Sequence, residues 1–133
     1  GEILELFDRV NYAHVATLMS DGSPQVTPMW VEVCANRILI NTDEGNVKFN
    51  NIRRDPRVAV SIVDQENPYK SAFIRGTVVG VHSEGATEHI DHLTKKYMNL
   101  ATFPYQERNI PRVIIEIEPE SIGSTLEHPS ADQ

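Results

Sequence analysis

Six short runs of apolar and β-branched residues, separated by turn-forming residues, constrain the fold of this chain more than any other feature. The clearest is 57–64, RVAVSIVD, in which apolar and smaller side chains alternate as in a buried strand. The other runs are 12–19, 25–33, 37–42, 69–82 and 111–125. Asp21 and Gly22 predict a hairpin turn between the first two runs. Pro28 predicts an edge strand or a bulge, because proline cannot donate to a sheet ladder.

Helical spacing of apolar residues is confined to short segments. We expect helices over 2–8, over about 44–54 and over 85–99, the second ended by Pro56. Six strands joined mainly in chain order, with two or three helices, predict a mainly β fold of the α+β class, arranged as a small barrel. We expect one domain over 1–126, followed by a polar C-terminal tail over 127–133.

Composition narrows the class of protein. A net charge of −7 argues against broad nucleic-acid binding, which needs a basic surface. The single cysteine, Cys34, excludes an internal disulfide and fits a reducing compartment. No apolar run approaches the roughly 20 residues of a membrane span. We therefore expect a cytoplasmic protein.

A basic cluster stands out in this acidic chain, within 41–58, NTDEGNVKFNNIRRDPRV. Lys48 falls near the start of the second expected helix, where unpaired N–H groups and the helix dipole favour an anion. Thr42 adds a hydroxyl, and Asn46 and Asn51 add amides, so the group suits a phosphate. The alternative is a solvated basic helix face, and spacing alone leaves both readings open. That face would be formed by Lys48, Arg53, Arg54 and Arg57.

Other candidate chemistry is weaker. His89 and His92 share a helix face but lack a third ligand at suitable spacing, so we expect no metal and a solvated face. Cys34 has no arranged base beside it, which argues against a nucleophile. The chain has no P-loop, no Gly-rich dinucleotide fingerprint and no Gly-x-Ser-x-Gly.

The order of motifs HVATLMSDGSPQVTPMWVEV, RILINTDEGNVKFNNIRRDPRVAVSIVD and HIDHLTKKYM resembles the flavin/deazaflavin oxidoreductase superfamily. These are pyridoxamine 5′-phosphate oxidase-like, FMN-binding split barrels, and the chain is most similar to the PPOX-class F420-dependent oxidoreductases. The resemblance spans about 7–122, and NTxxGxxKxxNxRRDPRV is its most specific part. It implies a six-stranded antiparallel split β-barrel with short flanking helices. It also implies a homodimer with the cofactor at the subunit interface and a small-molecule substrate.

The activity that the resemblance implies is hydride transfer between reduced F420 and an unsaturated organic acceptor. An FMN-binding oxidoreductase of the same fold is an alternative, as is a non-catalytic carrier of F420 or haem. Two departures argue against vitamin B6 oxidation: Val47 stands where pyridoxamine phosphate oxidases have an arginine, and their C-terminal Trp- and Arg-bearing signature is missing. No side chain stands out as an acid or base, which hydride transfer tolerates because the cofactor carries the chemistry.

The resemblance also implies which residues hold the cofactor. Those implied to surround its phosphate are Thr42, Asn46, Lys48, Asn51 and Arg54. Those implied to present their main chain to the polar edge of the ring are Val26, Thr27, Pro28 and Met29. Those implied to reach the site from the second subunit are Tyr69 and Lys70.

Overall fold

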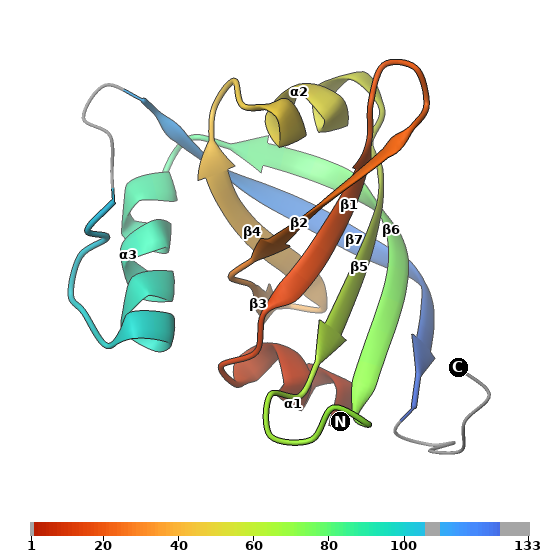
Figure 1. Cartoon of the computed structure of the whole chain (residues 1–133). Helices are drawn as coiled ribbons and strands as arrows, with labels where there is room; N and C mark the ends of the chain where they lie inside the picture. The colour runs from red at the N-terminus through yellow and green to blue at the C-terminus, as the bar shows by residue number, and fades with distance from the viewer. Residues whose placement is uncertain (1, 106–109, 126–133) are drawn as a thin grey trace.

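The computed structural model describes residues 2–105 and 110–125, which form one curled antiparallel sheet with three helices (Figure 1). The helices are α1 (Glu2–Asp8), α2 (Val47–Arg54) and α3 (Ala86–Met98). The strands are β1 (Ala13–Leu18), β2 (Pro24–Met29), β3 (Glu32–Cys34), β4 (Arg37–Asp43), β5 (Arg57–Val63), β6 (Ser71–His82) and β7 (Arg112–Ser124). The mainly β class is confirmed. The expected tail over 127–133 lies outside the described residues. None of the three helices has the length and apolar character needed to cross a membrane.

The prediction of six strands is wrong: the described residues form seven, in the order β2-β1-β5-β6-β7-β4-β3. The predicted run 25–33 is divided at Trp30 and Val31, so that β2 pairs with β1 and β3 pairs with β4. These consecutive strands are the two edges of the sheet. In a flat sheet the edges would lie about 29 Å apart, whereas the connection reaches only about 10 Å. The sheet therefore has to curl, and it stays open because β2 and β3 do not pair.

Side chains of helix α3 hydrogen-bond the backbone N–H and C=O of Val31, where the run 25–33 is divided. The N–H of Val31 donates to Oη of Tyr97 (3.1 Å), and its carbonyl accepts from Nζ of Lys96 (2.8 Å). The Tyr97 hydroxyl donates in turn to the carbonyl of Asn11 (2.6 Å). Burial raises the pKa of Tyr97 to about 12, so the phenol keeps its proton and remains a donor. Val31 is fully buried, and its polar groups are paired by a helix instead of a strand.

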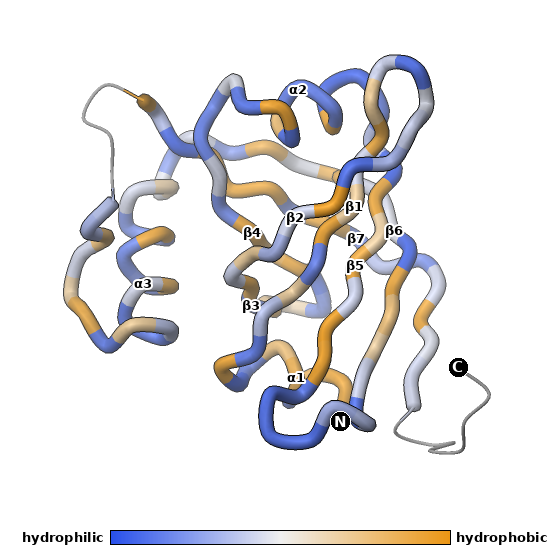
Figure 2. The backbone as a smooth tube through the Cα atoms, in the orientation of Figure 1, coloured by the Kyte–Doolittle hydropathy of each residue, from blue (hydrophilic) through white to orange (hydrophobic). Residues whose placement is uncertain are grey.

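The core lies inside the curl of the sheet. Every second residue of β1 and β5 faces inward, which gives the alternating burial that the sequence predicts. Figure 2 shows polar residues gathered in the turn between β1 and β2 and in the loop after β5. Helices α1 and α2 lie at opposite ends of the sheet (Figure 1) and add Phe7, Phe49 and Ile52 to the core.

The pairing of strand β6 is irregular at two glycines, Gly76 and Gly80. The pairing of β6 with β7 shifts register between Arg75 and Gly76 and again between Val78 and Gly80. A Cβ atom on Gly76 would lie 2.5 Å from the carbonyl oxygen of Glu118. A side chain at this position would thus collide with rigid backbone, which explains the glycine.

Candidate functional site

The start of α2 is built around Asn46. Its Oδ1 caps the helix by accepting from the N–H of Phe49 (2.8 Å), and its Nδ2 donates to Oγ1 of Thr42 on β4 (2.6 Å). The helix therefore begins at Val47, later than the predicted Glu44, and Lys48 belongs to its first turn. Nζ of Lys48 lies 3.5 Å from the same Thr42 hydroxyl. The structure thus brings together the three residues expected to hold a phosphate most directly.

Lys48 is a buried cation that lacks an anion of its own. Its residue surface is only 9% exposed, and within the described ranges it forms no ion pair. Burial lowers the pKa of Lys48, while nearby Asp43 raises it and Arg112 lowers it. Asp43 already accepts from Nη1 of Arg112 at 2.7 Å. Two partly buried cations therefore share one carboxylate, and this corner of the molecule favours an added anion.

Asn51 and Arg54 join α2 to the end of β1. Asn51 is 3% exposed, and its Nδ2 donates to Oγ1 of Thr17 at 3.0 Å. Nη2 of Arg54 donates to Oδ1 of Asn51 and to the carbonyl of Leu18, both at 2.9 Å. The side chain of Asn51 is thus held on both sides, whereas Arg54 is exposed and presents the rest of its guanidinium to solvent.

Strand β2 carries the four residues expected to offer their main chain. It pairs with β1 alone, so every second residue directs its N–H and C=O toward an open edge. The edge position of Pro28 agrees with its sequence, but no bulge forms, because the register with β1 runs unbroken from Met29 to Pro24. Oγ1 of Thr27 is buried and has no hydrogen-bond partner among the residues described. Because Thr27 pairs with buried Val15, its side chain faces the inside of the sheet, so β2 offers its main chain and not this hydroxyl at the open edge.

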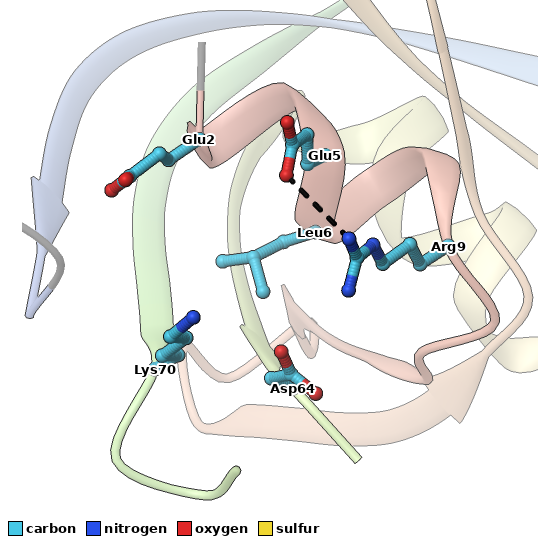
Figure 3. Close-up of a pocket in the computed structure, with 6 residues that line it drawn as sticks. All are labelled: Glu2, Glu5, Leu6, Arg9, Asp64 and Lys70. Carbon is cyan, nitrogen blue, oxygen red and sulfur yellow. Dashed lines mark ion pairs between the residues drawn. The ribbon is translucent and has the colours of Figure 1, made fainter. Parts of the chain in front are cut away.

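Tyr69 and Lys70 lie elsewhere in the chain. Their loop sits at the α1 end of the sheet, opposite α2 (Figure 1). Tyr69 is 80% exposed. Lys70 lines a small hollow of about 70 Å³ beside Glu2 and Glu5 of α1 and Arg9, which follows that helix (Figure 3). A single chain therefore does not bring these two residues to Lys48.

A second polar group runs from β7 through β4 to α3, and no sequence motif predicted it. Nε of Arg112 donates to Oδ1 of Asn41 (2.6 Å), and Nδ2 of Asn41 donates to the carbonyl of Ala86 (2.9 Å). The same Nδ2 lies 3.0 Å from Nδ1 of His89, and Nε2 of His89 lies 2.8 Å from Oε1 of Glu32. Because Arg112 and Ala86 fix the amide orientation, Nδ1 of His89 accepts and its Nε2 donates to Glu32.

This arrangement corrects the expectation that His89 and His92 form a solvated face. His89 is 8% exposed and hydrogen-bonded on both ring nitrogens, while exposed His92 lies 3.1 Å from the other Glu32 oxygen. The hydrogen bond from His89 lowers the pKa of Glu32, against burial, which raises it. In the described parts of the chain no cluster of His, Cys, Asp and Glu could hold a metal ion. Neither strand register nor the side on which α3 packs can be read from local spacing, so these contacts had no sequence signal.

Comparisons with known proteins identify the family and the fold of the chain. Residues 1–125 match the model of the pyridoxamine 5′-phosphate oxidase family, and the chain belongs to that family of FMN-binding split barrels. No curated protein matches the chain. A solved structure of an F420 reductase is 29% identical, with a TM-score of 0.83, over 92% of this chain and 97% of that one.

Two more distant structures share the fold. The conserved hypothetical protein Rv2991 of Mycobacterium tuberculosis is 23% identical, with a TM-score of 0.72, over 99% of this chain and 89% of its own. A Listeria innocua protein described as a candidate pyridoxamine 5′-phosphate oxidase is 21% identical, with a TM-score of 0.71, over 92% of this chain and 94% of its own.

Proposed function

We propose that this protein is an F420-dependent oxidoreductase that transfers a hydride between the reduced deazaflavin and an unsaturated organic acceptor. The observation that carries the proposal is Lys48, a buried ammonium beside Thr42 and Asn46. Among the residues described, the carboxylate that acts on it is Asp43, which is already hydrogen-bonded to Arg112. A phosphate would balance this charge through charge-assisted hydrogen bonds. The similarity to an F420 reductase supports the choice of deazaflavin.

The residues present fit such a cofactor. Lys48, Thr42 and Asn46 would hold its phosphate, and Asn51 and Arg54 would flank it. The main-chain groups on the open edge of β2 would receive the polar edge of the ring. When bound, the reduced cofactor supplies the hydride, and the protein supplies binding, orientation and exclusion of water.

We propose a homodimer as the working form. Tyr69 and Lys70 lie at the far end of the sheet from Lys48, so they can contribute only from a second subunit. The outer face of the sheet offers a surface for that subunit. Its exposed apolar side chains include Val26, Phe73 and Ile122, which are 61%, 44% and 55% exposed.

FMN is the alternative cofactor, because the chain belongs to a family of FMN-binding split barrels. F420 differs by a tail of carboxylates beyond the phosphate, which would meet positive charge along α2. Arg57 is already paired with Asp55 (2.7 Å), whereas Arg54 is exposed and has no carboxylate partner among the described residues. Arg54 is therefore the side chain most suited to the tail. The second alternative is a protein of the same fold that binds F420 or haem as a carrier and catalyses no reaction.

A titration with F420, FMN and haem at several salt concentrations tests the proposal. F420 should bind more tightly than FMN at low ionic strength, and the preference should shrink as salt screens the exposed tail contacts. Arg54→Gln should reduce the preference, while Arg9→Gln at the opposite end of the molecule should not. Equal affinities at low salt, or a preference for FMN unchanged by Arg54→Gln, would favour the flavin alternative. Tight haem binding without F420 binding would overturn the proposal.

A further inference from the structure

A hollow of about 360 Å³ lies between α3 and the strands β2 and β4. We call it the α3 pocket. Pro28 and Met29 of β2 form one wall, and Asn41 of β4 and Arg112 of β7 contribute polar groups. It therefore adjoins the strand proposed to receive the cofactor ring. The function proposed above does not account for it.

The other walls of the α3 pocket are aromatic and apolar. Trp30 stacks on Tyr97 with ring centroids 5.2 Å apart, and Phe103 meets Trp30 edge to face at 5.8 Å. Tyr12 lines the mouth and is 40% exposed. Buried Ile90 and Leu93 form the side toward α3. Flat aromatic walls favour a flat ligand.

Arg112 is the charged side chain among the described residues that line the pocket. Its side chain is 10% exposed, and the guanidinium lies over the ring of Phe103 at 5.0 Å. Nε is used by Asn41 and Nη1 by Asp43, and the described residues offer no acceptor to Nη2. A buried guanidinium with an unused nitrogen in an aromatic hollow suits a carboxylate.

We propose that the α3 pocket binds the acceptor, and that the acceptor is a flat, conjugated carboxylic acid held through Arg112. That the bound acid is the hydride acceptor rests on the proposed function. That the pocket binds a carboxylate rests on the geometry of the pocket alone. Asn41 and His89 act as positioning residues, because they fix the orientation of the guanidinium from α3.

The reaction balances with the reduced cofactor, the unsaturated acid and a proton from water. The carbon–carbon double bond of the acid receives the hydride, with its two electrons, at one carbon and a proton from water at the other. The double bond becomes a single bond, the cofactor is left oxidised by two electrons, and the carboxylate is unchanged. Arg112 therefore needs only to bind and orient.

Trp30 provides a readout that needs neither cofactor nor turnover, because it is the only tryptophan of the chain. Trans-cinnamate, a flat conjugated carboxylate, should quench its fluorescence saturably in the cofactor-free protein. Cinnamamide, which has the same shape without the charge, should bind at least tenfold more weakly. Arg112→Gln should remove this preference, and Arg75→Gln, on the outer face of the sheet, should keep it.

Equal binding of the two probes by the wild-type protein would overturn the proposal even if Arg112→Gln failed to fold. A preference that survives Arg112→Gln would overturn it as well. Displacement of cinnamate by saturating cofactor would show that the ring itself occupies the hollow, which also excludes an acceptor site there. The cofactor titration has a separate readout: cinnamate preference without F420 binding would leave the carboxylate site standing and remove the proposed function.

Discussion

Burial of Lys48 costs the fold stability, and we propose that a bound phosphate offsets this cost. Its ammonium is buried, and the carboxylate nearest to it is committed to Arg112. Lys48→Met keeps the length of the side chain and removes the desolvation cost. We expect the affinity for a phosphate-bearing cofactor to fall by about ten- to a hundredfold.

The same variant should leave the melting temperature of the cofactor-free protein unchanged or raise it by up to about 3 °C. Isothermal titration and thermal unfolding measure the two effects, with exposed Lys95→Met as the matched control. A lower melting temperature with unchanged affinity would make Lys48 a structural residue.

Glu32 should give stability a defined dependence on pH. The hydrogen bond from His89 holds its pKa below the ordinary value of 4.5. A carboxyl with a lowered folded pKa contributes stability that is present above its unfolded pKa and is lost as the pH falls through the folded pKa. Glu32→Gln should therefore lower the free energy of unfolding by about 1–2 kcal/mol at neutral pH. The loss should shrink as the pH falls below 4.5 and through the lowered folded pKa.

Urea unfolding of Glu32→Gln at neutral and acidic pH checks this expectation. Glu88→Gln, on the exposed face of α3, is the control and should change little at either pH. A loss of equal size at both pH values would mean that the charge of Glu32 is not what stabilises its contact with His89.

At the scale of one element, the start of α2 allows helix capping and the proposed ligand binding to be tested separately. The two ends of the Asn46 amide have different partners: Oδ1 accepts from the N–H of Phe49, and Nδ2 donates to Thr42. Asn46→Ala should remove the cap and destabilise the protein by about 1 kcal/mol. Asn46→Asp keeps an acceptor for the cap, loses the donor to Thr42 and adds a negative charge beside the proposed phosphate.

We expect Asn46→Asp to retain the stability of the wild type and to bind cofactor at least tenfold more weakly. Thermal unfolding and titration of both variants distinguish the roles. If Asn46→Asp bound cofactor as tightly as the wild type, Asn46 would not face a phosphate.

The elements also show what the sequence can predict. Strands such as β5 were predictable because one buried face imposes strict alternation. The division of 25–33 was not, because Val31 is paired by Tyr97 and Lys96, more than sixty positions later. Thr42, Asn46 and Lys48 were found together because one local turn gathers them. The contacts of Arg112 with Asn41 and Asp43 depend on the register between β4 and β7, which no local pattern specifies.

At the scale of the whole molecule, the outer face of the sheet carries an apolar surface across β2, β6 and β7. Exposed Val26, Phe73 and Ile122 surround a hollow of about 420 Å³. The hollow is also lined by the small side chains of Ala16 and Ala59 and by the polar residues His14, Ser61, Arg75 and Ser121. Such a surface on a chain of this size indicates an interface with another protein surface. The proposed site needs a second copy to supply Tyr69 and Lys70, so we predict that this surface holds a homodimer together.

Ile122→Glu tests the dimer, because a charge at the centre of an apolar interface would be buried without a partner. Light scattering should give twice the mass of one chain for the wild type and a monomer, or a weak dimer, for the variant. Leu100→Glu, an exposed apolar position beyond the end of α3, should remain dimeric.

The monomeric Ile122→Glu variant should stay folded, since Ile122 is 55% exposed within one chain. It should bind cofactor at least tenfold more weakly, because the residues of the partner subunit are missing from its site. A wild-type monomer that binds cofactor with full affinity would show that one chain completes the site and that Tyr69 and Lys70 have no part in it.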